Sequence, residues 1–445
     1  MNYLKKLNIN LLLALIIPFL ILGPFLPDLI VSLSSLVFLI YLFKKKNFNY
    51  FNKKVVITFF VFCLYCILVS IFFAKNRILS LESSLFYFRI GLFACLIWYL
   101  IEQDKKILKY FYYALAICFS VLVVDGYFQF FLGFNIIGLP IYSERISSFF
   151  GSELIMGSYL SRLFPLLFSL FLIKKKGNLE VYFIAGLFIL VDILIFISGE
   201  RSSFAFLNLS TLFIIILIKK YQKLRLYTFI FSLIIITTLS YYNDKISNRM
   251  IHSTLKSFGL DNENNQNQNK NIPNHNSSNT SDSKRLNNTS DSKRLNMFSP
   301  DHDSLIRTGF NIFLDKPIFG HGPKMFRVIC KDEKYAIGIS PCDNHPHNFY
   351  IQLLAETGII GFSFLFSTFA YVLYCAYRQF KSIVLRQQRY LIDYQVCLLA
   401  GILITVWPFT TNGNFFNNWL MIVYSLPVGF YLHSIYGKNR KNISF

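Results

Sequence analysis

The sequence has little charge for its length. Only 15% of its 445 residues are Asp, Glu, Lys or Arg, whereas 54% are hydrophobic and 18% are aromatic. Soluble proteins usually carry about 25% charged residues, so a water-exposed globular surface is excluded. Apolar runs approaching the roughly 20 residues that a helix needs to cross a hydrocarbon core recur along the whole chain, which indicates a polytopic membrane protein.

Twelve apolar runs predict the architecture. They are continuously apolar instead of alternating in segments of about ten residues, so they predict helices and not the strands of a barrel. We therefore expect an all-α membrane protein with about twelve transmembrane helices, nine in residues 1–242 and three in 347–436, followed by a short tail at 437–445. The predicted spans are 8–26, 28–43, 55–74, 83–101, 108–132, 153–173, 180–198, 202–218, 226–242, 347–376, 390–410 and 415–436.

The first run lacks a small-residue cleavage site and is followed at once by a second run, so we expect a retained helix and not a signal peptide. Both termini then lie on one side. Acidic residues are scarce, 23 against 44 Lys and Arg, and the basic residues are unevenly placed: 24 fall in segments on the side of the termini and four in the short connections opposite. The positive-inside rule makes the termini cytoplasmic. The net charge of +21 therefore indicates orientation, not a nucleic-acid partner.

A long hydrophilic stretch, about 243–346, separates the ninth and tenth predicted spans and is expected outside the cytoplasm. Its first half reads as a polar linker and contains the nine-residue repeat NTSDSKRLN twice in tandem at 279–296. Such a segment buries too little apolar surface to offset its ordering entropy. We expect disorder and no chemistry over 261–297.

The second part of this loop, 303–346, regains apolar periodicity, with Asp303 or Ser304 as the expected helix cap. The loop also holds two cysteines, Cys330 and Cys342, whereas the other six of the eight fall inside predicted spans. In an oxidising periplasm this pair is expected to form a disulfide. Two free thiols are the alternative. Function is expected in this part of the loop.

Three arginines are expected at the outer membrane face. Arg145 precedes the sixth span, Arg201 stands in the turn between the seventh and eighth, and Arg307 lies in the loop. Ionisable groups beside a bilayer are costly and are functional candidates. The alternative is that each arginine pairs with a neighbour such as Glu144 or Glu200.

Charged residues inside the spans raise the same question. Arg162 falls about nine residues into the sixth span, so it must face the bundle interior or pair with an acid. Arg89, with Glu82 as a possible partner, Asp125 and Asp192 are similar. The sequence does not assign their partners, and structural pairing is an alternative to catalysis.

Histidine is scarce, with seven residues in the chain, yet two of them flank Pro346 at the head of the tenth span. Proline suits the first position of a helix, which would place His345 near the cap and His347 in the first turn, on one face with Tyr350. The positive end of the helix dipole disfavours a protonated imidazole, so His347 is expected to be a neutral base. Glu356, nine residues on, is expected to face a neighbouring element.

A neutral base beside a helix N-terminus, which can hold phosphate oxygens, suits one class of reaction. An acceptor hydroxyl would attack a carbon whose leaving group is a phosphate or diphosphate, and arginine forks would neutralise the departing charge without a metal. Two alternatives remain open: the histidines only hydrogen-bond the loop, or they form a metal site with Asp343, His321, His302 and Asp301.

Two motifs carry a family likeness. Residues 347–361, HNFYIQLLAETGIIG, together with the upstream RTGFNIFLDKPIFGHG, resemble the signature region of the bacterial O-antigen ligase and polymerase family. The segments RISSFFGSELIMGSYLSRLFP and SGERSSF are similar to the family's arginine-bearing outer segments. The likeness covers roughly 140–205 and 303–362, whereas the first four spans match only in hydropathy.

The resemblance implies an activity. Members of this family are metal-independent glycosyltransferases of the C-type architecture that need no cofactor. They take a glycan from undecaprenyl diphosphate on the periplasmic face of the bacterial inner membrane. The acceptor is a lipid A core sugar for a ligase and the end of another lipid-linked glycan for a polymerase; protein hydroxyls are a third possibility. The histidine motif favours the ligase branch.

The resemblance also implies roles for residues. His347 would activate the acceptor hydroxyl, Arg145 and Arg201 would hold the donor diphosphate, and Arg307 would assist from the loop. Further supporting positions are expected at His345, His321, Tyr350, Arg162 and Glu356.

A transporter or flippase of lipid-linked glycans is the alternative from another class. It would also have about twelve spans, but it should carry internal repeats and key charges at mid-depth. The two halves show no repeat, and the strongest charge cluster is expected at the outer rim. The sequence does not indicate an oligomeric state.

Overall fold

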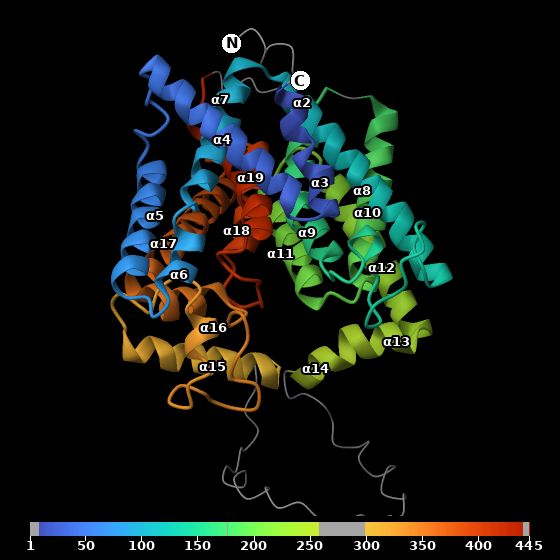
Figure 1. Cartoon of the computed structure of the whole chain (residues 1–445). Helices are drawn as coiled ribbons and strands as arrows, with labels where there is room; N and C mark the ends of the chain where they lie inside the picture. The colour runs from blue at the N-terminus through green and yellow to red at the C-terminus, as the bar shows by residue number, and fades with distance from the viewer. Residues whose placement is uncertain (1–8, 176, 258–298, 439–444) are drawn as a thin grey trace, which may run out of the picture.

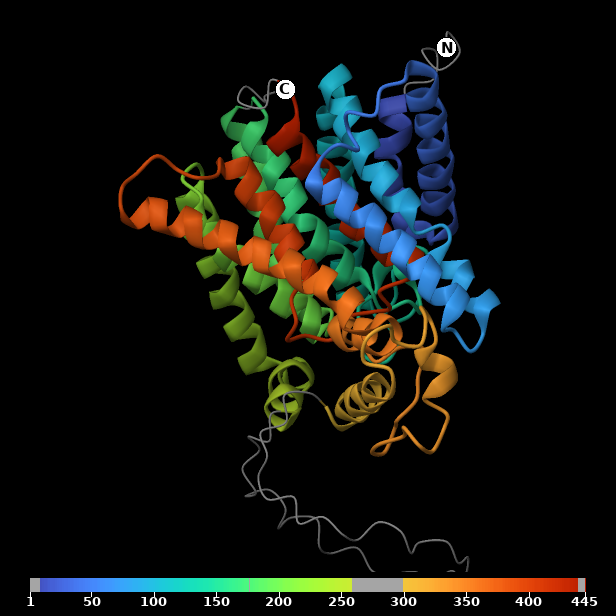
Figure 2. The same ribbon diagram turned by 90° about the vertical axis from the view of Figure 1, so that its left-hand side faces the viewer.

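The computed structural model describes residues 9–175, 177–257, 299–438 and 445. Every named element in these residues is a helix. Figures 1 and 2 show a bundle in which α2 and the end of α19 lie at one end, while the short helices α13 to α16 lie together at the opposite end. We call this second end the outer face.

The helices follow the predicted apolar runs closely. The first part of the bundle contains α2 (Ile9–Ala14), α3 (Ile16–Leu22), α4 (Phe25–Lys45), α5 (Lys54–Phe72), α6 (Arg77–Ser84), α7 (Phe88–Gln103), α8 (Lys106–Leu132), η1 (Ser148–Phe150), α9 (Met156–Ile173), α10 (Asn178–Ile197), α11 (Arg201–Leu217) and α12 (Gln222–Tyr242). The remainder contains α13 (Asp244–Ser247), η2 (Asn248–His252), α14 (Ser253–Ser257), α15 (Pro300–Asp315), α16 (Phe326–Ile329), α17 (Phe349–Val384), α18 (Asp393–Thr405) and α19 (Asn418–Tyr436).

Nine helical segments of the described chain are long and apolar enough to cross a membrane, and three shorter apolar segments occupy the places of the other predicted spans. The first of the short ones corrects the prediction of a single helix at 8–26. The chain forms α2 and α3 instead, with Leu15 between them. The reason is Pro18, which has no N–H to donate to the carbonyl of Ala14 four residues earlier.

The second correction concerns α18, which was expected over 390–410 and spans only the 13 residues Asp393–Thr405. Pro408 lies just beyond its end, and proline disfavours helical conformation in the residue before it. The released chain at 406–417 turns back across the outer face. It contacts the head of α17, where Asn348 Nδ2 donates to Pro408 O at 2.8 Å.

The third correction is a break inside α17. Gly358 has φ 62° and ψ −166°, so the helix is interrupted there. The freed groups find partners: Ile359 N–H donates to Pro317 O at 2.9 Å, and Thr357 O accepts from the Tyr65 hydroxyl at 2.7 Å. The segment 317–322 packs so closely that a Cβ at Gly358 would clash with Ile318 O. The KPIFGHG block therefore docks the outer loop onto this break.

The polar residues inside the bundle mostly have structural partners. Asp192 of α10 binds Arg225 of α12 through two hydrogen bonds of 2.7 and 2.9 Å. Arg89, whose partner the sequence does not assign, pairs with Asp28 at 2.5 Å. The remaining one, Asp125, accepts hydrogen bonds from the Ser148 hydroxyl and from Asn135 and Ile136 of the loop after α8. These contacts stabilise the bundle and, at Asp125, the loop after α8.

Candidate functional site

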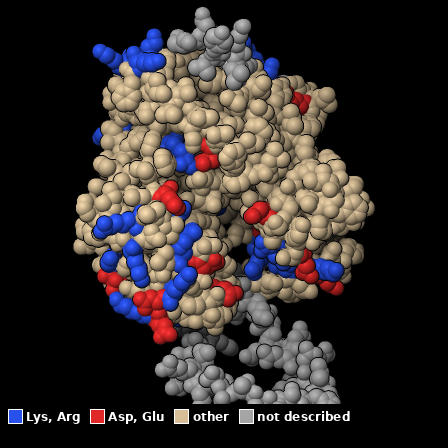
Figure 3. Space-filling model, in the orientation of Figure 1, with Lys and Arg blue, Asp and Glu red and all other residues tan. Residues whose placement is uncertain are grey.

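The outer face is hollowed between two bodies of structure. Figure 3 shows the hollow between the part built on α15 and α16 and the part built on α12 and α13, with both signs of charge gathered around it. Lys and Arg predominate at the opposite end of the molecule. Most residues singled out from the sequence lie in the segments that surround this hollow.

The turn that carries His347 differs from its prediction. α17 begins at Phe349, and its cap is Asn348, whose Oδ1 accepts from the N–H groups of Tyr350 and Ile351 at 3.0 and 3.2 Å. His347 therefore precedes the helix, and Pro346 is not its first residue. The backbone of His347 is left-handed, with φ 54°, a conformation that residues other than glycine rarely adopt. Its carbonyl is held by Asn412 N–H at 2.8 Å.

Three histidine rings meet at this turn. The His347 ring centroid lies 4.1 Å from that of His345 and 5.1 Å from that of His302, with the last pair edge to face. The sequence named His302 only as part of a metal alternative. The ring of His347 is oriented by Asp343, whose Oδ2 lies 3.1 Å from its Nε2. The four side chains form one cluster, which we call the histidine cluster.

The environment of the histidine cluster favours the uncharged forms of His345 and His302 and the charged form of Asp343. Burial, followed by the charge of His347, lowers the pKa of His345 to about 4, and burial also lowers the pKa of His302. For Asp343, burial raises the pKa, but hydrogen bonds from Asn344 N–H and His347 outweigh it and leave the pKa below its usual range. His347 precedes the first turn of α17, where the sequence had placed it at the positive end of the helix dipole. Its orientation is fixed instead by the carboxylate of Asp343.

Three arginines form a second cluster at the hollow. Arg145 and Arg201, both expected from sequence, are joined by Arg249 of η2, which was not. Arg249 Nε donates to Gly199 O at 3.2 Å and its Nη1 to Ser143 O at 3.3 Å. Burial, followed by the charges of Arg145 and Arg201, lowers the pKa of Arg249. We call these three residues the arginine cluster; their crowded positive charges suit an anion.

The turn before α11 holds the arginine cluster in place. Gly199 has φ 75°, and a Cβ there would lie 2.5 Å from Arg249 Nε, so only glycine permits the contact. Arg201 Nη1 donates to Ser253 O at 3.0 Å. The carboxylate of Glu200, which the sequence offered as a partner for these arginines, has other hydrogen bonds. It accepts from Gly157 N–H, Ser158 N–H and the Ser203 hydroxyl. It thereby satisfies the first free amides of α9.

The two clusters are adjacent. Burial, followed by the charge of His347 and to a smaller extent that of Arg201, lowers the pKa of His302, whose ring contacts His347. A direct contact joins their segments, since the hydroxyls of Ser202, next to Arg201, and of Thr411 lie 2.8 Å apart. Thr411 precedes Asn412, whose N–H holds the carbonyl of His347. The structure thus brings together His347, His345, Arg145 and Arg201, which come from three separate stretches of sequence.

Arg307 is placed apart from the arginine cluster. Its Nε donates to Asp303 Oδ2 at 2.8 Å along the exposed side of α15. It lines a cavity of about 390 Å³ whose other walls are mainly apolar residues of α15 together with Ile337 and Ile351. The helix itself begins at Pro300, three to four residues before the predicted cap. Arg307 therefore belongs to the exposed side of α15, whereas Arg145 and Arg201 are neighbours of Arg249.

The remaining predicted positions support the loop. His321 Nε2 lies 3.2 Å from Ile312 O, beneath α15. The hydroxyl of Tyr350 donates to Val406 O at 2.5 Å and ties α17 to the end of α18. Glu356 faces a neighbouring element, as its spacing predicts, because its carboxylate accepts from Phe326 N–H at 3.1 Å. Arg162 lies deep in α9, where its Nη2 donates to Asn412 Oδ1 at 2.9 Å.

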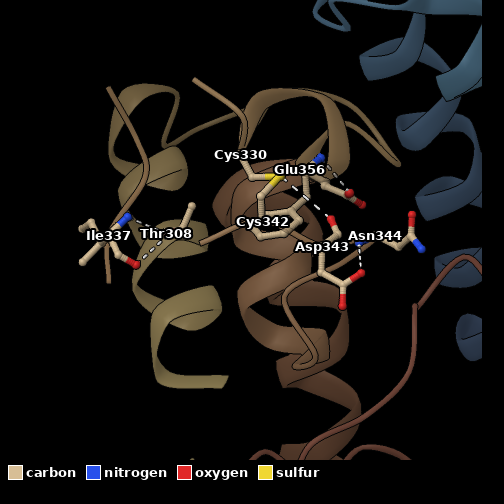
Figure 4. The surroundings of a disulfide bond; sticks show 8 residues. Thr308, Cys330, Ile337, Cys342, Asp343, Asn344 and Glu356 are labelled. Carbon is tan, nitrogen blue, oxygen red and sulfur yellow. Dashed lines mark hydrogen bonds between the residues drawn. A yellow bond between two sulfur atoms is a disulfide. The ribbon is translucent and has the colours of Figure 1, made fainter. Parts of the chain in front are cut away.

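A disulfide closes the loop just before the histidine cluster. Cys330 and Cys342, which are 12 positions apart in the sequence, are bonded, with their Cα atoms 5.0 Å apart. Figure 4 shows that the bond lies beside the head of α17, with Asp343 on the strand of chain that leaves it. The crosslink therefore restrains the carboxylate that orients His347.

Removing this crosslink should loosen the loop. We expect Cys330→Ser with Cys342→Ser to lower the free energy of opening of the 330–347 segment by about 3 kcal/mol, the chain entropy released for a loop of this length. Limited proteolysis of the purified protein measures this opening, and wild-type protein treated with a reductant is the control. Unchanged protease resistance in the double variant would contradict a restraining role.

The described residues contain no group of three or more His, Cys, Asp or Glu side chains arranged to hold a metal ion. Of the residues in the metal alternative, His321 bonds beneath α15, whereas His302, His345 and Asp343 surround His347 in the histidine cluster. The predicted disordered stretch 261–297 lies outside the described residues.

The buried His345 predicts acid sensitivity. Neither of its ring nitrogens has a partner of good hydrogen-bond geometry among the described residues. The pKa of His345 is about 4 in the folded protein, against an ordinary 6.5. As the pH falls, His345 is therefore protonated in the opened loop before it is protonated in the folded one. The free energy that favours the closed loop is therefore complete above pH 6.5 and falls progressively toward pH 4, with a loss of about 2 kcal/mol at pH 5.

Hydrogen exchange of the 343–350 segment at pH 7.5 and pH 5, corrected for intrinsic exchange rates, measures this loss. His345→Asn, which cannot titrate, is expected to remove most of the pH dependence. A pH dependence equal to that of the wild type would contradict the assignment to His345.

Comparison with known proteins was made by sequence. A family model described as O-Antigen ligase matches residues 185–366, about two fifths of the chain. This stretch contains Arg201, Arg249, Arg307 and the histidine cluster, whereas Arg145 and Arg162 lie before it. No curated protein matches the chain.

Proposed function

Because residues 185–366 belong to the O-antigen ligase family, we propose that the protein is a membrane glycosyltransferase that moves a glycan from undecaprenyl diphosphate to an acceptor hydroxyl. The proposed acceptor is a lipid A core sugar, as for a ligase, and polymerisation onto another lipid-linked glycan is the alternative within the family. The reaction is proposed to occur on the periplasmic face of the bacterial inner membrane, with both termini cytoplasmic and without a cofactor or metal.

One observation carries the proposal. A histidine oriented by a carboxylate stands beside a cluster of three arginines on one face of a helical bundle, and His302 contacts the first while it feels the charge of the second. A transporter would place its key charges at mid-depth. In the described interior, the buried pair Asp192 and Arg225 satisfies itself instead.

The proposed mechanism is a single displacement. The acceptor hydroxyl loses its proton to His347, and its oxygen forms a bond to the anomeric carbon while the bond from that carbon to the diphosphate oxygen breaks. Asp343 accepts a hydrogen bond from the Nε2–H of His347, which leaves the unprotonated Nδ1 to take the proton from the acceptor. Arg145, Arg201 and Arg249 stabilise the negative charge that develops on the departing diphosphate.

Deletion of the gene in its own host, followed by lipopolysaccharide gel analysis and extraction of lipid-linked glycans, tests the proposal. Loss of the capped ladder with accumulation of lipid-linked polymer supports a ligase. Capping by single repeats indicates the polymerase instead. Lipid-linked glycan retained on the cytoplasmic side of the membrane would indicate a flippase and overturn the proposed glycosyltransferase activity.

A further inference from the structure

Arg162 is a buried cation beneath the His347 turn. It lies on α9, the helix at the centre of the bundle, and is only 4% exposed. Its guanidinium lies between two aromatic rings, 4.4 Å from the centroid of Phe206 and 4.5 Å from that of Tyr424. Its hydrogen bonds go to neutral acceptors, the Ser158 hydroxyl, Ile404 O and Asn412 Oδ1. Burying a cation in this way is costly, so its contacts call for an explanation beyond packing.

The strongest of these bonds leads directly to the site. Arg162 Nη2 lies 2.9 Å from Asn412 Oδ1, and the main-chain N–H of Asn412 donates to the carbonyl of His347 at 2.8 Å. Four residues earlier, Pro408 O accepts from the side chain of Asn348 at 2.8 Å. The segment 408–412 therefore holds both the residue that carries the imidazole and the cap of α17.

This hold matters because of the backbone of His347. Its φ of 54° is left-handed, and such a conformation persists only where the surroundings determine it. The segment 408–412 is outside any helix and has no regular ladder of its own to fix it. Arg162 supplies a fixed point, since it is anchored by two rings and by the carbonyl of Ile404 in α18.

We infer that Arg162 is a positioning residue for His347. It holds the side chain of Asn412, so that the main chain of Asn412 fixes the carbonyl of His347 and with it the direction of the ring. The inference rests on the proposed function, because it gives Arg162 a role only if His347 takes part in the reaction. Arg225 provides the contrast, since it is equally buried but paired with Asp192.

Kinetics separates positioning from general stability. Arg162→Met keeps the length and apolar character of the side chain but removes the hydrogen bond to Asn412. A displaced base lowers the rate of the chemical step and leaves binding intact, so we expect kcat to fall by about 10- to 100-fold with little change in KM for the donor. The assay uses the full-length protein in lipid vesicles with a lipid-linked glycan donor and a saccharide acceptor.

Variants of Asn412 make the test specific. Asn412→Asp keeps an oxygen for Arg162 and the same main-chain N–H, so it should retain most of the wild-type kcat. Asn412→Leu removes the oxygen and should match Arg162→Met. The double variant should be no slower than either single variant, because both changes break one connection. Arg225→Met, measured on the folded fraction, is the control for loss of a buried arginine and should keep the wild-type kcat.

The outcomes are distinct. Wild-type kcat in Arg162→Met, in a protein whose transfer is lost on His347→Ala, overturns the inference alone. Transfer that survives His347→Ala overturns the proposed function first. If Arg162→Met does not fold, Asn412→Leu carries the same test, and additive losses in kcat for the double variant count against a shared connection.

Discussion

Replacing His347 with alanine is expected to lower the rate of glycan transfer by about 10²- to 10⁴-fold, the usual contribution of a positioned general base. The reason lies in the geometry of the histidine cluster, where Asp343 Oδ2 lies 3.1 Å from the Nε2 atom of His347. The measurement is single-turnover transfer in vesicles, with expression and thermal stability recorded in parallel. Asp343→Asn should lower the rate by less, because it leaves the imidazole but loses its orientation.

A histidine elsewhere provides the control. His433 is buried in α19, near the end of the bundle opposite the outer face. His433→Gln is therefore expected to leave transfer at the wild-type level. If His347→Ala transferred glycan at the wild-type rate, His347 could not be the general base, even though its segment matches the family model.

The second large effect is expected at Arg249, the member of the arginine cluster that sequence reasoning missed. Arg249→Gln removes a positive charge that we propose faces the departing diphosphate, and loss of one such stabilising group typically costs about 10²- to 10³-fold in rate. The side chain of Arg249 also connects Gly199 O with Ser143 O by hydrogen bonds. The variant should therefore also disturb the positions of Arg145 and Arg201, which lie close to these two residues in the sequence. Initial rates at varied donor concentration would show both a lower kcat and a higher KM.

Two substitutions serve as controls for loss of charge. Lys245→Gln changes an exposed cation on the preceding helix α13 and should have little effect. Arg307→Gln should also have a smaller effect than Arg249→Gln, because Arg307 pairs with Asp303 on the side of α15. A greater loss at Arg307 than at Arg249 would restore the role that the sequence gave to Arg307 and argue against the cluster described here.

The sequence predicts the membrane architecture well because continuous apolar runs are a direct physical requirement of a bilayer. Its errors occur where local chemistry interrupts a run. Pro18 divides the first helix, Pro408 shortens α18, and Gly358 breaks α17. Each interruption could be suspected from the residue type, but its partner, such as Pro317 O for the freed amide of Ile359, lies on a distant segment.

The site was predicted in part for a similar reason. His347, Arg145 and Arg201 stand out by residue type and position, but Asp343 and His302 become neighbours of His347 only through folding of the loop. Arg249 was missed because its segment reads as the beginning of a linker. A signal was present nonetheless: Ile246 and Met250, four residues apart and both buried, have helical spacing.

The break at Gly358 has a mechanical consequence. The outer turns of α17, which carry Glu356 at their inner end, are joined to the 317–322 segment by hydrogen bonds from His321 N–H to Ala355 O and from Gly322 N–H to Glu356 O. The longer inner part of α17 begins at Ile359, whose N–H donates to Pro317 O, and has exposed apolar side chains such as Phe366 and Leu373. Because the bonds on both sides of Gly358 join α17 to the 317–322 segment, a tilt of the inner part in a bilayer of different thickness should be resisted at the break before it reaches the His347 turn.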